Sequence, residues 1–386
     1  MANIIDYALL NANKNFDTVP FSKIDGLILA QLSYMRYDGI VPDIKSRTKG
    51  VLFSDIVESD GYNKMFPLER TAERNKMLLN AVAYSKRYGK IRINYYENIF
   101  DSSKDAQFCA VTFILENGDA YIAFRGTDST ITGWKENFNM LYMSPVASQT
   151  LSVPYVEKVA RKTKGNLTLL GHSKGGNLAI YAAVMCSDKV RDRIIEIQSF
   201  DNPGFTEEFI NSEKYLETES RISKLVPEES MIGMLLNNRG RYRVVKSDGV
   251  GFYQHDPFMW KIENNDFINA DGVVTRARII DGTFNEWVFG FSPEQREMFI
   301  EGLFNVIEAT NAQNAATFAQ WSENLKGNTT LILDALKDLN PETRSLMLKV
   351  LGNLFVSAKD TVATTQKRII KRKIKSIPLL SPANER

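Results

Sequence analysis

The sequence predicts an α/β fold with a mostly parallel central sheet, and three observations support this. Short apolar runs of strand type alternate with longer segments of helical spacing between residues 90 and 246. Such alternation is typical of parallel strands joined by crossover helices. Residues 167–183 read L-T-L-L-G-H-S-K-G-G-N-L-A-I-Y-A-A, in which a strand pattern, a glycine-bracketed turn and a helix pattern follow directly on one another. From residue 292 onward the patterns become helical.

Length and composition are those of a globular chain with additions to one α/β domain. The 386 residues are 44% hydrophobic and 24% charged, which is enough to bury a large core and long for a single ordinary domain. We expect an N-terminal helical extension packed on the core over residues 1–90 and an α/β core over 91–291. A helical region over 292–365 and a basic tail over 366–386 should follow.

The first half of the chain predicts two helices and then strands. Apolar residues at helical spacing predict a helix within 20–37 and another over 69–87, which Gly89 would end. Residues 90–98, 107–115 and 119–124 predict strands, the last two joined by a hairpin turn at Asn117-Gly118. Residues 134–143 are aromatic and apolar without a clear period.

The second half predicts the crossover helices and further strands of the sheet. Residues 153–162 should form the helix that leads back to the strand before Ser173. Three β runs follow at 194–200, 222–226 and 242–246. Ser292-Pro293-Glu294-Gln295 predicts the start of a helix, because it combines a capping box with proline at the first helical position.

The turn at Ser173 predicts a nucleophile. A sharp turn between strand and helix exposes the serine hydroxyl above the sheet and requires very small residues two positions before and after it, a need that Gly171 and Gly175 meet. The first N–H groups of the following helix, beginning with that of Lys174, point to where an oxyanion would form. A tight structural turn is the alternative interpretation.

Residues 121–139 add a second motif to the turn at Ser173, and the two together resemble a known family. Residues 121–139, Y-I-A-F-R-G-T-D-S-T-I-T-G-W-K-E-N-F-N, resemble the F-R-G-[ST]…W…N block of class 3 lipases. Together with G-H-S-K-G-G-N-L-A, S-F-D-N-P-G-F (199–205) and Q-H-D-P (254–257), it is most similar to an uncharacterised bacterial branch of lipase-like α/β-hydrolases, over roughly residues 20–300. The resemblance implies an α/β-hydrolase fold. Lys174 stands where class 3 lipases commonly have Leu, a difference that bears on the substrate class.

A serine nucleophile needs a base, and the chain contains only two histidines. His172 adjoins the serine and should point elsewhere, packing beside the turn. His255 follows the last β run, in the loop where α/β-hydrolases carry their base, and the order Ser, acid, His is then satisfied. We therefore expect His255 to be the base.

The acid that would orient this base has several candidates. Asp201 ends the β run after the helix that follows Ser173, and S-F-D-x-P-G-F is the pattern of the resembled branch. Glu228 and Glu229 follow the next β run, where the acid is commonest in this fold. Asp256 is a further alternative, as is the absence of any acid. Asp201 is favoured, and its other interpretation is a turn residue that bonds its own backbone.

The resemblance also implies one oxyanion donor. In class 3 lipases the hydroxyl-bearing residue after F-R-G supplies it, and that residue here is Thr127. Its main-chain N–H and that of Lys174 would hold a tetrahedral oxyanion, each stabilising the transition state by about 3–4 kcal/mol. Arg125 should be structural.

These features predict a serine esterase or lipase-like hydrolase acting on an ester or acyl-lipid substrate through an acyl-enzyme. The alternative is a non-catalytic hydrolase-fold protein that binds a lipid, membrane or protein partner, and a peptidase or acyltransferase would share the same residues. We expect no nucleic-acid partner, because basic residues cluster only in the tail without interleaved aromatics. We also expect no cofactor and no metal, since no set of metal ligands appears in the sequence.

The termini bear on location. The N-terminus lacks a basic segment followed by an apolar run, and no eighteen apolar residues are contiguous, so we expect a cytoplasmic protein. The tail segment Lys367–Lys375 carries six basic residues, with isoleucines on one helical face. This pattern is typical of a helix that contacts anionic membranes peripherally. A solvated end of the chain is the alternative.

Overall fold

The computed structural model describes residues 2–66, 71–128, 130–274 and 290–309, with Pro341 and Arg344. Residues 1–296 form one compact unit and residues 297–386 a second. Most of the expected helical region over 292–365, and the whole basic tail with Lys367–Lys375, lie outside the described residues. Among the helices that are described, none has the length and apolarity needed to cross a bilayer.

The described residues form an eight-stranded sheet in which the strands lie in chain order from β1 to β8. The first four pair antiparallel and the last four continue from β4 in parallel. The strands are β1 (Val51–Leu52), β2 (Arg92–Asp101), β3 (Ala106–Ile114), β4 (Ala120–Phe124), β5 (Leu167–His172), β6 (Ile194–Phe200), β7 (Ile222–Pro227) and β8 (Tyr242–Val245). A separate hairpin joins β9 (Ile262–Glu263) to β10 (Asp266–Phe267). The predicted α/β-hydrolase fold with its mostly parallel sheet is confirmed.

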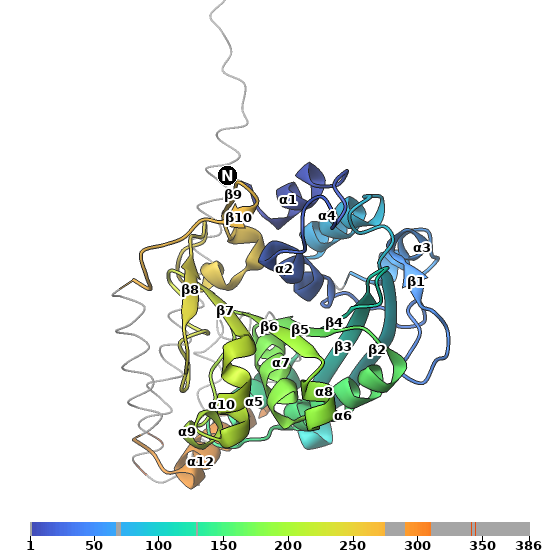
Figure 1. The fold of residues 1–386 in the computed structure, drawn as a ribbon. Coiled ribbons are helices and arrows are strands. Elements are labelled where there is room, and N and C mark those ends of the chain that lie inside the picture. The colour runs from blue at the N-terminus through green and yellow to red at the C-terminus, as the bar shows by residue number, and fades with distance from the viewer. Residues whose placement is uncertain are drawn as a thin grey trace, which may run out of the picture. The chain divides into compact units, whose positions relative to one another are not determined.

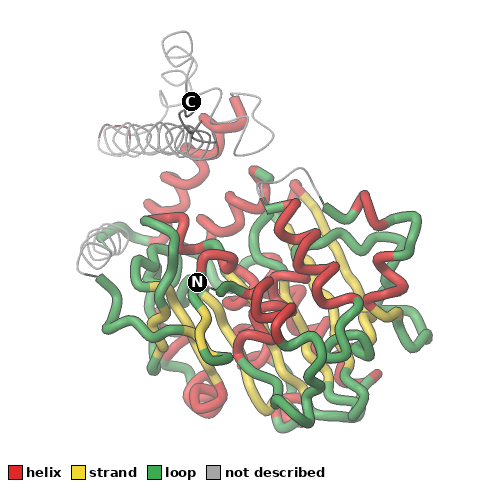
Figure 2. Tube along the Cα trace, turned by 90° about the horizontal axis from the view of Figure 1, so that it is seen from above, coloured by secondary structure: helices red, strands yellow, loops and turns green. Residues whose placement is uncertain are grey.

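Helices cover both faces of the sheet (Figures 1 and 2). Figure 1 shows α1 (Ile4–Leu10), α2 (Lys23–Leu32) and α4 (Ala72–Ala83) on one side. On the other side lie α6 (Ala147–Lys162), α7 (Lys174–Met185) and α10 (Glu213–Thr218). The other α-helices of the described residues are α3 (Phe53–Val57), α5 (Ile131–Asn139), α8 (Asp188–Arg191), α9 (Glu207–Ile210) and α12 (Pro293–Ala309).

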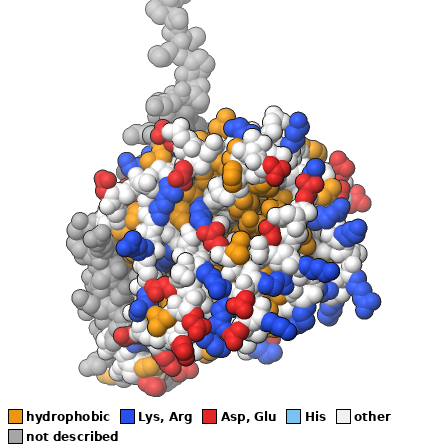
Figure 3. Space-filling model, viewed as in Figure 1, with side chains coloured by type: hydrophobic (Ala, Val, Ile, Leu, Met, Phe, Trp, Pro, Cys, Tyr) orange, Lys and Arg blue, Asp and Glu red, His pale blue; other side chains and the backbone are white. Residues whose placement is uncertain are grey.

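The core has two parts because neighbouring strand residues point to opposite faces of the sheet. On β5, Leu170 packs with the N-terminal helices, whereas Leu169 packs with α6 and α7. Both faces are therefore apolar, and the strands read as nearly continuous hydrophobic runs in the sequence. On the surface drawn in Figure 3, positive and negative side chains are interspersed.

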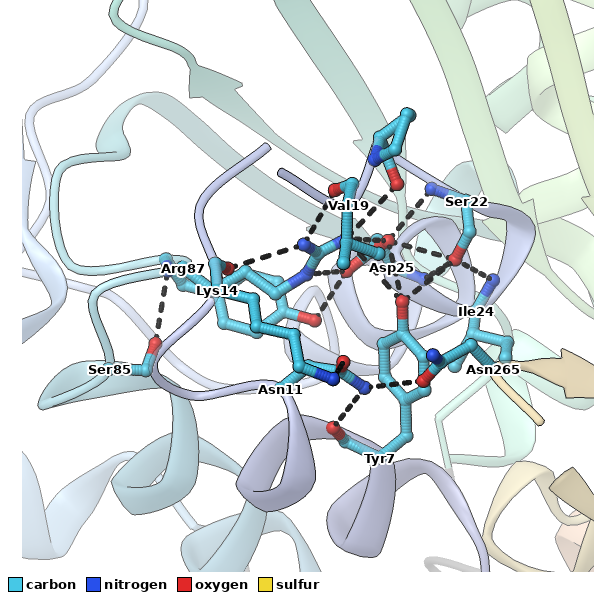
Figure 4. Close-up of polar contacts among 12 residues, drawn as sticks. Tyr7, Asn11, Lys14, Val19, Ser22, Ile24, Asp25, Ser85, Arg87 and Asn265 are labelled. Atoms are coloured by element: carbon cyan, nitrogen blue, oxygen red, sulfur yellow. Dashed lines mark hydrogen bonds and ion pairs between the residues drawn. The ribbon is translucent and has the colours of Figure 1, made fainter. Parts of the chain in front are cut away.

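A buried ion pair anchors α2 (Figure 4). The Arg87 guanidinium donates through Nε and Nη2 to the two carboxylate oxygens of Asp25, both at 2.7 Å, and neither side chain is exposed. The hydroxyl of Tyr88 donates to Asp25 at 2.6 Å, and Arg87 also donates to the carbonyl of Val19 at 2.8 Å. Because the pair is bidentate and its remaining donors find carbonyls, it fixes where α2 lies on the sheet.

Three helices differ from the sequence expectation. Helix α4 ends at Ala83 rather than just before Gly89. Helix α6 begins at Ala147 rather than Val153 and contains Pro154. Helix α5 occupies most of the segment that showed no clear period. Its inward position holds the charged Glu136, 1% exposed, where an amphipathic pattern would have an apolar residue. The predicted capping box at Ser292 is confirmed, since Ser292 and Gln295 exchange side-chain hydrogen bonds with each other's main-chain N–H.

Candidate active site

Ser173 lies in the strained turn between β5 and α7. Its backbone has φ 58° and ψ −134°, a region that residues with a side chain rarely adopt. The turn closes tightly: a Cβ on Gly171 would overlap the backbone of Gly175, and one on Gly175 would overlap the carbonyl of Phe124. The Ser173 N–H donates to the carbonyl of Phe200 at the end of β6, at 2.9 Å. The turn is thus held by the two strands that flank β5.

His255 and Asp201 meet near this turn, although 53 residues separate them in the chain. His255 lies in a 3-10 helix after β8, and Asp201 directly follows β6. The distance between Nδ1 of His255 and Oδ2 of Asp201 is 2.7 Å. The carboxylate is fully buried, whereas the His255 side chain is 17% exposed.

Asp201 is oriented by residues that sequence reasoning did not identify. Its Oδ1 accepts hydrogen bonds from the hydroxyl of Ser230 and from the main-chain N–H of Gly233, the latter at 3.1 Å. Burial would raise the pKa of Asp201, but the hydrogen bond and charge of His255, with the Ser230 hydrogen bond, outweigh it, so the pKa is lowered. The carboxylate is therefore ionised at neutral pH. No sequence signal marked Ser230 or Gly233.

The other candidate acids have different partners. The carboxylate of Glu229 accepts from the N–H of Gly251, and its own N–H donates to Oε1 of Gln254 at 2.8 Å. Glu228 is tied through its main chain to Val245. The Asp256 carboxylate pairs with Arg74 at 2.7 Å. The acid that lies on the His255 imidazole is therefore Asp201.

The two candidate oxyanion donors come from different segments. Among the described residues, neither the main-chain N–H of Thr127 nor that of Lys174 donates to a protein acceptor. The Thr127 hydroxyl accepts from Nδ2 of Asn137 at 2.5 Å, which ties this segment to α5. A free N–H at the start of α7 is expected, because the first N–H groups of a helix have no partner within it.

The Lys174 side chain lies away from the exposed side of the turn. It is 0% exposed, and its ammonium donates to Oε2 of Glu136 at 2.6 Å and to the main-chain and side-chain oxygens of Gln107 at 2.7 and 2.8 Å. Burial lowers the pKa of Lys174, and Glu136 opposes that effect. The ammonium is held by three acceptors, so the Lys that replaces the common Leu has a structural place.

Arg125 is buried beside the candidate oxyanion segment. It donates to Oδ1 of Asn98 at 3.2 Å and lies 3.6 Å from the carboxylate of Asp128.

In the described part of the chain, no three His, Cys, Asp or Glu side chains gather as metal ligands would.

Residues 82–305, more than half of the chain, match the Mbeg1-like family. The chain belongs to the Mbeg1-like family. The match includes the segments of Thr127, Ser173, Asp201 and His255, and it begins after α1 and α2, at the last two residues of α4. No curated protein matches the chain.

Several solved lipase structures are similar to this Mbeg1-like chain at low identity. The Rhizomucor miehei lipase propeptide complex is 12% identical, with 43% of this chain and 58% of that chain covered and a TM-score of 0.31. A triacylglycerol lipase whose catalytic centre is a serine protease triad is 14% identical (57% and 77% covered, TM-score 0.37). M37 lipase is 12% identical (69% and 80% covered, TM-score 0.36). This chain thus spans little more than half the length of the first, and likeness at this level says nothing about its activity.

Proposed function

We propose that this Mbeg1-like chain is a serine hydrolase that cleaves carboxylic esters through an acyl-enzyme. Ser173 is the nucleophile, His255 the base and Asp201 the acid that orients it. The observation that carries the proposal is the 2.7 Å contact between the buried Asp201 carboxylate and Nδ1 of His255. The main-chain carbonyl of His255 lies 2.8 Å from Nε2 of His172, the residue before a serine in a strained turn. Strain at a residue with a side chain persists where the surroundings impose it, and such residues cluster at functional sites.

The first half of the reaction forms the acyl-enzyme. Nε2 of His255 takes the hydroxyl proton of Ser173 as Oγ bonds to the ester carbonyl carbon. The carbonyl π electrons move to oxygen, giving a tetrahedral oxyanion. When that intermediate collapses, the C–O bond to the alcohol breaks, and the alcohol oxygen takes the proton from His255.

Water completes the second half. His255 removes a proton from water as its oxygen attacks the acyl carbon, and collapse of the second tetrahedral intermediate breaks the bond to Ser173 Oγ. The serine regains its proton from His255, and a carboxylic acid is released. Asp201 stays ionised throughout, which fits its lowered pKa, and stabilises the imidazolium that forms twice per cycle.

The main-chain N–H groups of Thr127 and Lys174 would bind the oxyanion in both halves. Within the described ranges neither donor has a protein acceptor, which suits such a site, since the two groups need not be released from other partners during the reaction. The Lys174 side chain is buried with Glu136 and Gln107, so its difference from Leu does not exclude an acyl-lipid substrate. We infer an ester substrate, acyl lipids included.

A fluorophosphonate probe tests the proposal. The wild-type chain should be labelled at Ser173, and Ser173→Ala should remove both labelling and hydrolysis of a short p-nitrophenyl ester. His255→Ala should remove turnover while the far-UV circular dichroism is unchanged, because the imidazole is partly exposed and carries little packing. An unlabelled wild-type chain would overturn the proposal in favour of a protein that binds a partner without catalysis.

A further inference from the structure

His172, the last residue of β5, is a buried histidine for which the reaction above has no use. Its side chain is 4% exposed. Nε2 lies 2.8 Å from the main-chain carbonyl oxygen of His255, and Nδ1 lies 3.0 Å from the hydroxyl of Tyr34. Both ring nitrogens therefore have a defined partner.

These partners select one tautomer of His172. A carbonyl oxygen can only accept, so Nε2 must carry the proton. Burial, with His255 nearby, lowers the pKa of His172 to about 3, so the ring is neutral at physiological pH. Nδ1 of a neutral ring with Nε2–H is an acceptor, and the Tyr34 hydroxyl donates to it.

The result is that His255 is held at two points. Its imidazole donates to Asp201, and its main-chain carbonyl accepts from His172. The two imidazole rings are also in contact, with centroids 4.4 Å apart and planes tilted by 35°. The hydrogen bond to Asp201 orients the His255 imidazole, and the hydrogen bond from His172 positions the His255 main chain.

Tyr34 connects this contact to the oxyanion segment. It follows α2, which the Asp25–Arg87 pair anchors (Figure 4), and it lies outside the segment that matches the family. A Cβ on Gly126 would overlap the Tyr34 hydroxyl, so Gly126, next to Thr127, packs directly against it. The one hydroxyl thus touches both the residue before Thr127 and the residue before Ser173.

A second contact ties the same loop to the N-terminal helices. Arg74 on α4 pairs with Asp256 at 2.7 Å, and its guanidinium carbon lies 4.8 Å from the ring centroid of Phe258. Asp256 directly follows His255. Arg74 therefore holds the side chains of two residues that closely follow His255, while His172 holds the His255 carbonyl.

We propose that Tyr34 and His172 are positioning residues that set the backbone of His255, so that the N-terminal helices complete the active site. The inference rests on the proposed function for its catalytic consequence. Loss of the Tyr34 hydroxyl lets the neutral His172 ring turn, and loss of the His172 donor releases the His255 carbonyl. Displacement of a base by about 1 Å lowers the rate by roughly 100-fold even when the mutation is far from the chemistry.

Four variants separate positioning from general packing. Tyr34→Phe removes one hydroxyl, and Tyr37→Phe is its matched control, because the buried Tyr37 hydroxyl donates to the Leu32 carbonyl at 2.9 Å. His172→Leu removes the donor to His255, whereas the side-chain amide of His172→Gln can replace it. The fraction of each preparation labelled by fluorophosphonate gives the folded active population, and kcat is normalised to it.

We expect Tyr34→Phe and His172→Leu to lower kcat by roughly 10- to 100-fold with KM unchanged. His172→Gln should recover part of that loss, and Tyr37→Phe should keep the wild-type kcat. Equal kcat for Tyr34→Phe and Tyr37→Phe, or for His172→Leu and His172→Gln, would overturn the inference.

A readout that needs no turnover keeps this test separate from that of the proposed function. The His255 Nδ1 proton, shared with Asp201, should give a low-field proton resonance that Asp201→Asn removes. Tyr34→Phe and His172→Leu should broaden or shift it, and Tyr37→Phe should not. If the wild-type chain fails to react with fluorophosphonate, the proposed function fails, and this resonance alone decides the positioning role; its retention in all variants would overturn that role.

Discussion

The buried pair of Lys174 and Glu136 offers the sharpest test of how the site is held together. It joins the first residue of α7 to α5, next to the segment that carries Thr127. The two side chains are 0% and 1% exposed. Besides Lys174, the Glu136 carboxylate accepts from the N–H of Ser148 at 2.7 Å and from that of Gln107 at 3.1 Å. Lys174→Met keeps the volume and removes the positive charge.

The cost of this change follows from what is left behind. Removing one partner of a buried ion pair typically costs about 3–5 kcal/mol, because the other charge stays buried without compensation. Two main-chain donors remain on Glu136, so we expect a loss near the lower limit, about 3 kcal/mol in the free energy of unfolding. A domain is stable by only about 5–15 kcal/mol, so a loss of this size is readily measured.

Urea unfolding followed by far-UV circular dichroism measures this loss. The midpoint should fall by roughly 1–3 M, since the free energy of unfolding of small domains changes by about 1–3 kcal/mol per molar urea. Lys90→Met is the matched control: Lys90 pairs with Glu116 at 3.0 Å, but the two side chains are 73% and 65% exposed. That surface pair should contribute less than about 1 kcal/mol.

A double-mutant cycle with Glu136→Gln decides the interpretation. The two single changes should each destabilise, and the double variant should lose less than their sum by about 1–3 kcal/mol, because the residues share one hydrogen-bonded network. Additivity within about 0.5 kcal/mol would refute the coupling. A Lys174→Met variant as stable as Lys90→Met would refute the argument from burial.

Three further predictions concern the acid, the pH dependence of stability and the tail. Asp201→Asn should lower kcat by about four orders of magnitude, because it deprives His255 of the carboxylate that fixes its tautomer, whereas Glu228→Gln should leave p-nitrophenyl ester hydrolysis near wild type; a dead Glu228→Gln would reverse this assignment. His172 has an ordinary pKa of 6.5 and a folded-state pKa of about 3, so the unfolded chain binds a proton that the folded chain does not. The free energy of unfolding should therefore fall below pH 6.5 by up to about 1.4 kcal/mol per pH unit. The lowered pKa of Asp201 affects stability only at lower pH, as the solution passes below the ordinary pKa of 3.8. The urea midpoint of His172→Gln should therefore change less between pH 6 and pH 4 than that of the wild type. An equal change of midpoint with pH in both proteins would contradict this prediction. A chain ending at Thr365 should sediment less with anionic vesicles at low salt than the full chain, since each basic residue of Lys367–Lys375 contributes about 1 kcal/mol near such a surface; equal binding by both would exclude this role.

The sequence by itself determined the features that depend on neighbours in the chain. The turn at Ser173 was predictable because a strand pattern, two glycines and a helix pattern occupy consecutive residues, and the required conformation is local. The strands from β2 to β8 were predictable in type because each is a short apolar run bounded by turn residues or a helical segment. Local steric and hydrophobic signals of this kind do not need a partner elsewhere in the fold.

Only the tertiary structure decided which distant groups meet. The sequence left the acid open among Asp201, two glutamates, Asp256 and no acid at all, because the answer depends on how the loops after β6, β7 and β8 lie at one edge of the sheet. Asp201 lies on His255, while Glu229 binds the backbone of Gly251 in the same loop region. A carboxylate's role here is set by distance in space, and the spacing of residues in the chain does not fix that distance.

The same reason explains α5 and Tyr34. The inward Glu136 broke the apolar period of α5 and is compatible with burial only because Lys174, 38 residues later, brings the opposite charge. No sequence pattern marked Tyr34: it is one tyrosine after a helix, and its hydroxyl meets His172, 138 residues away, only because of where α2 lies. Local patterns therefore determined the elements and the strained turn at Ser173. The polar contacts that orient the site arose from packing, since each needs two partners that the chain keeps far apart.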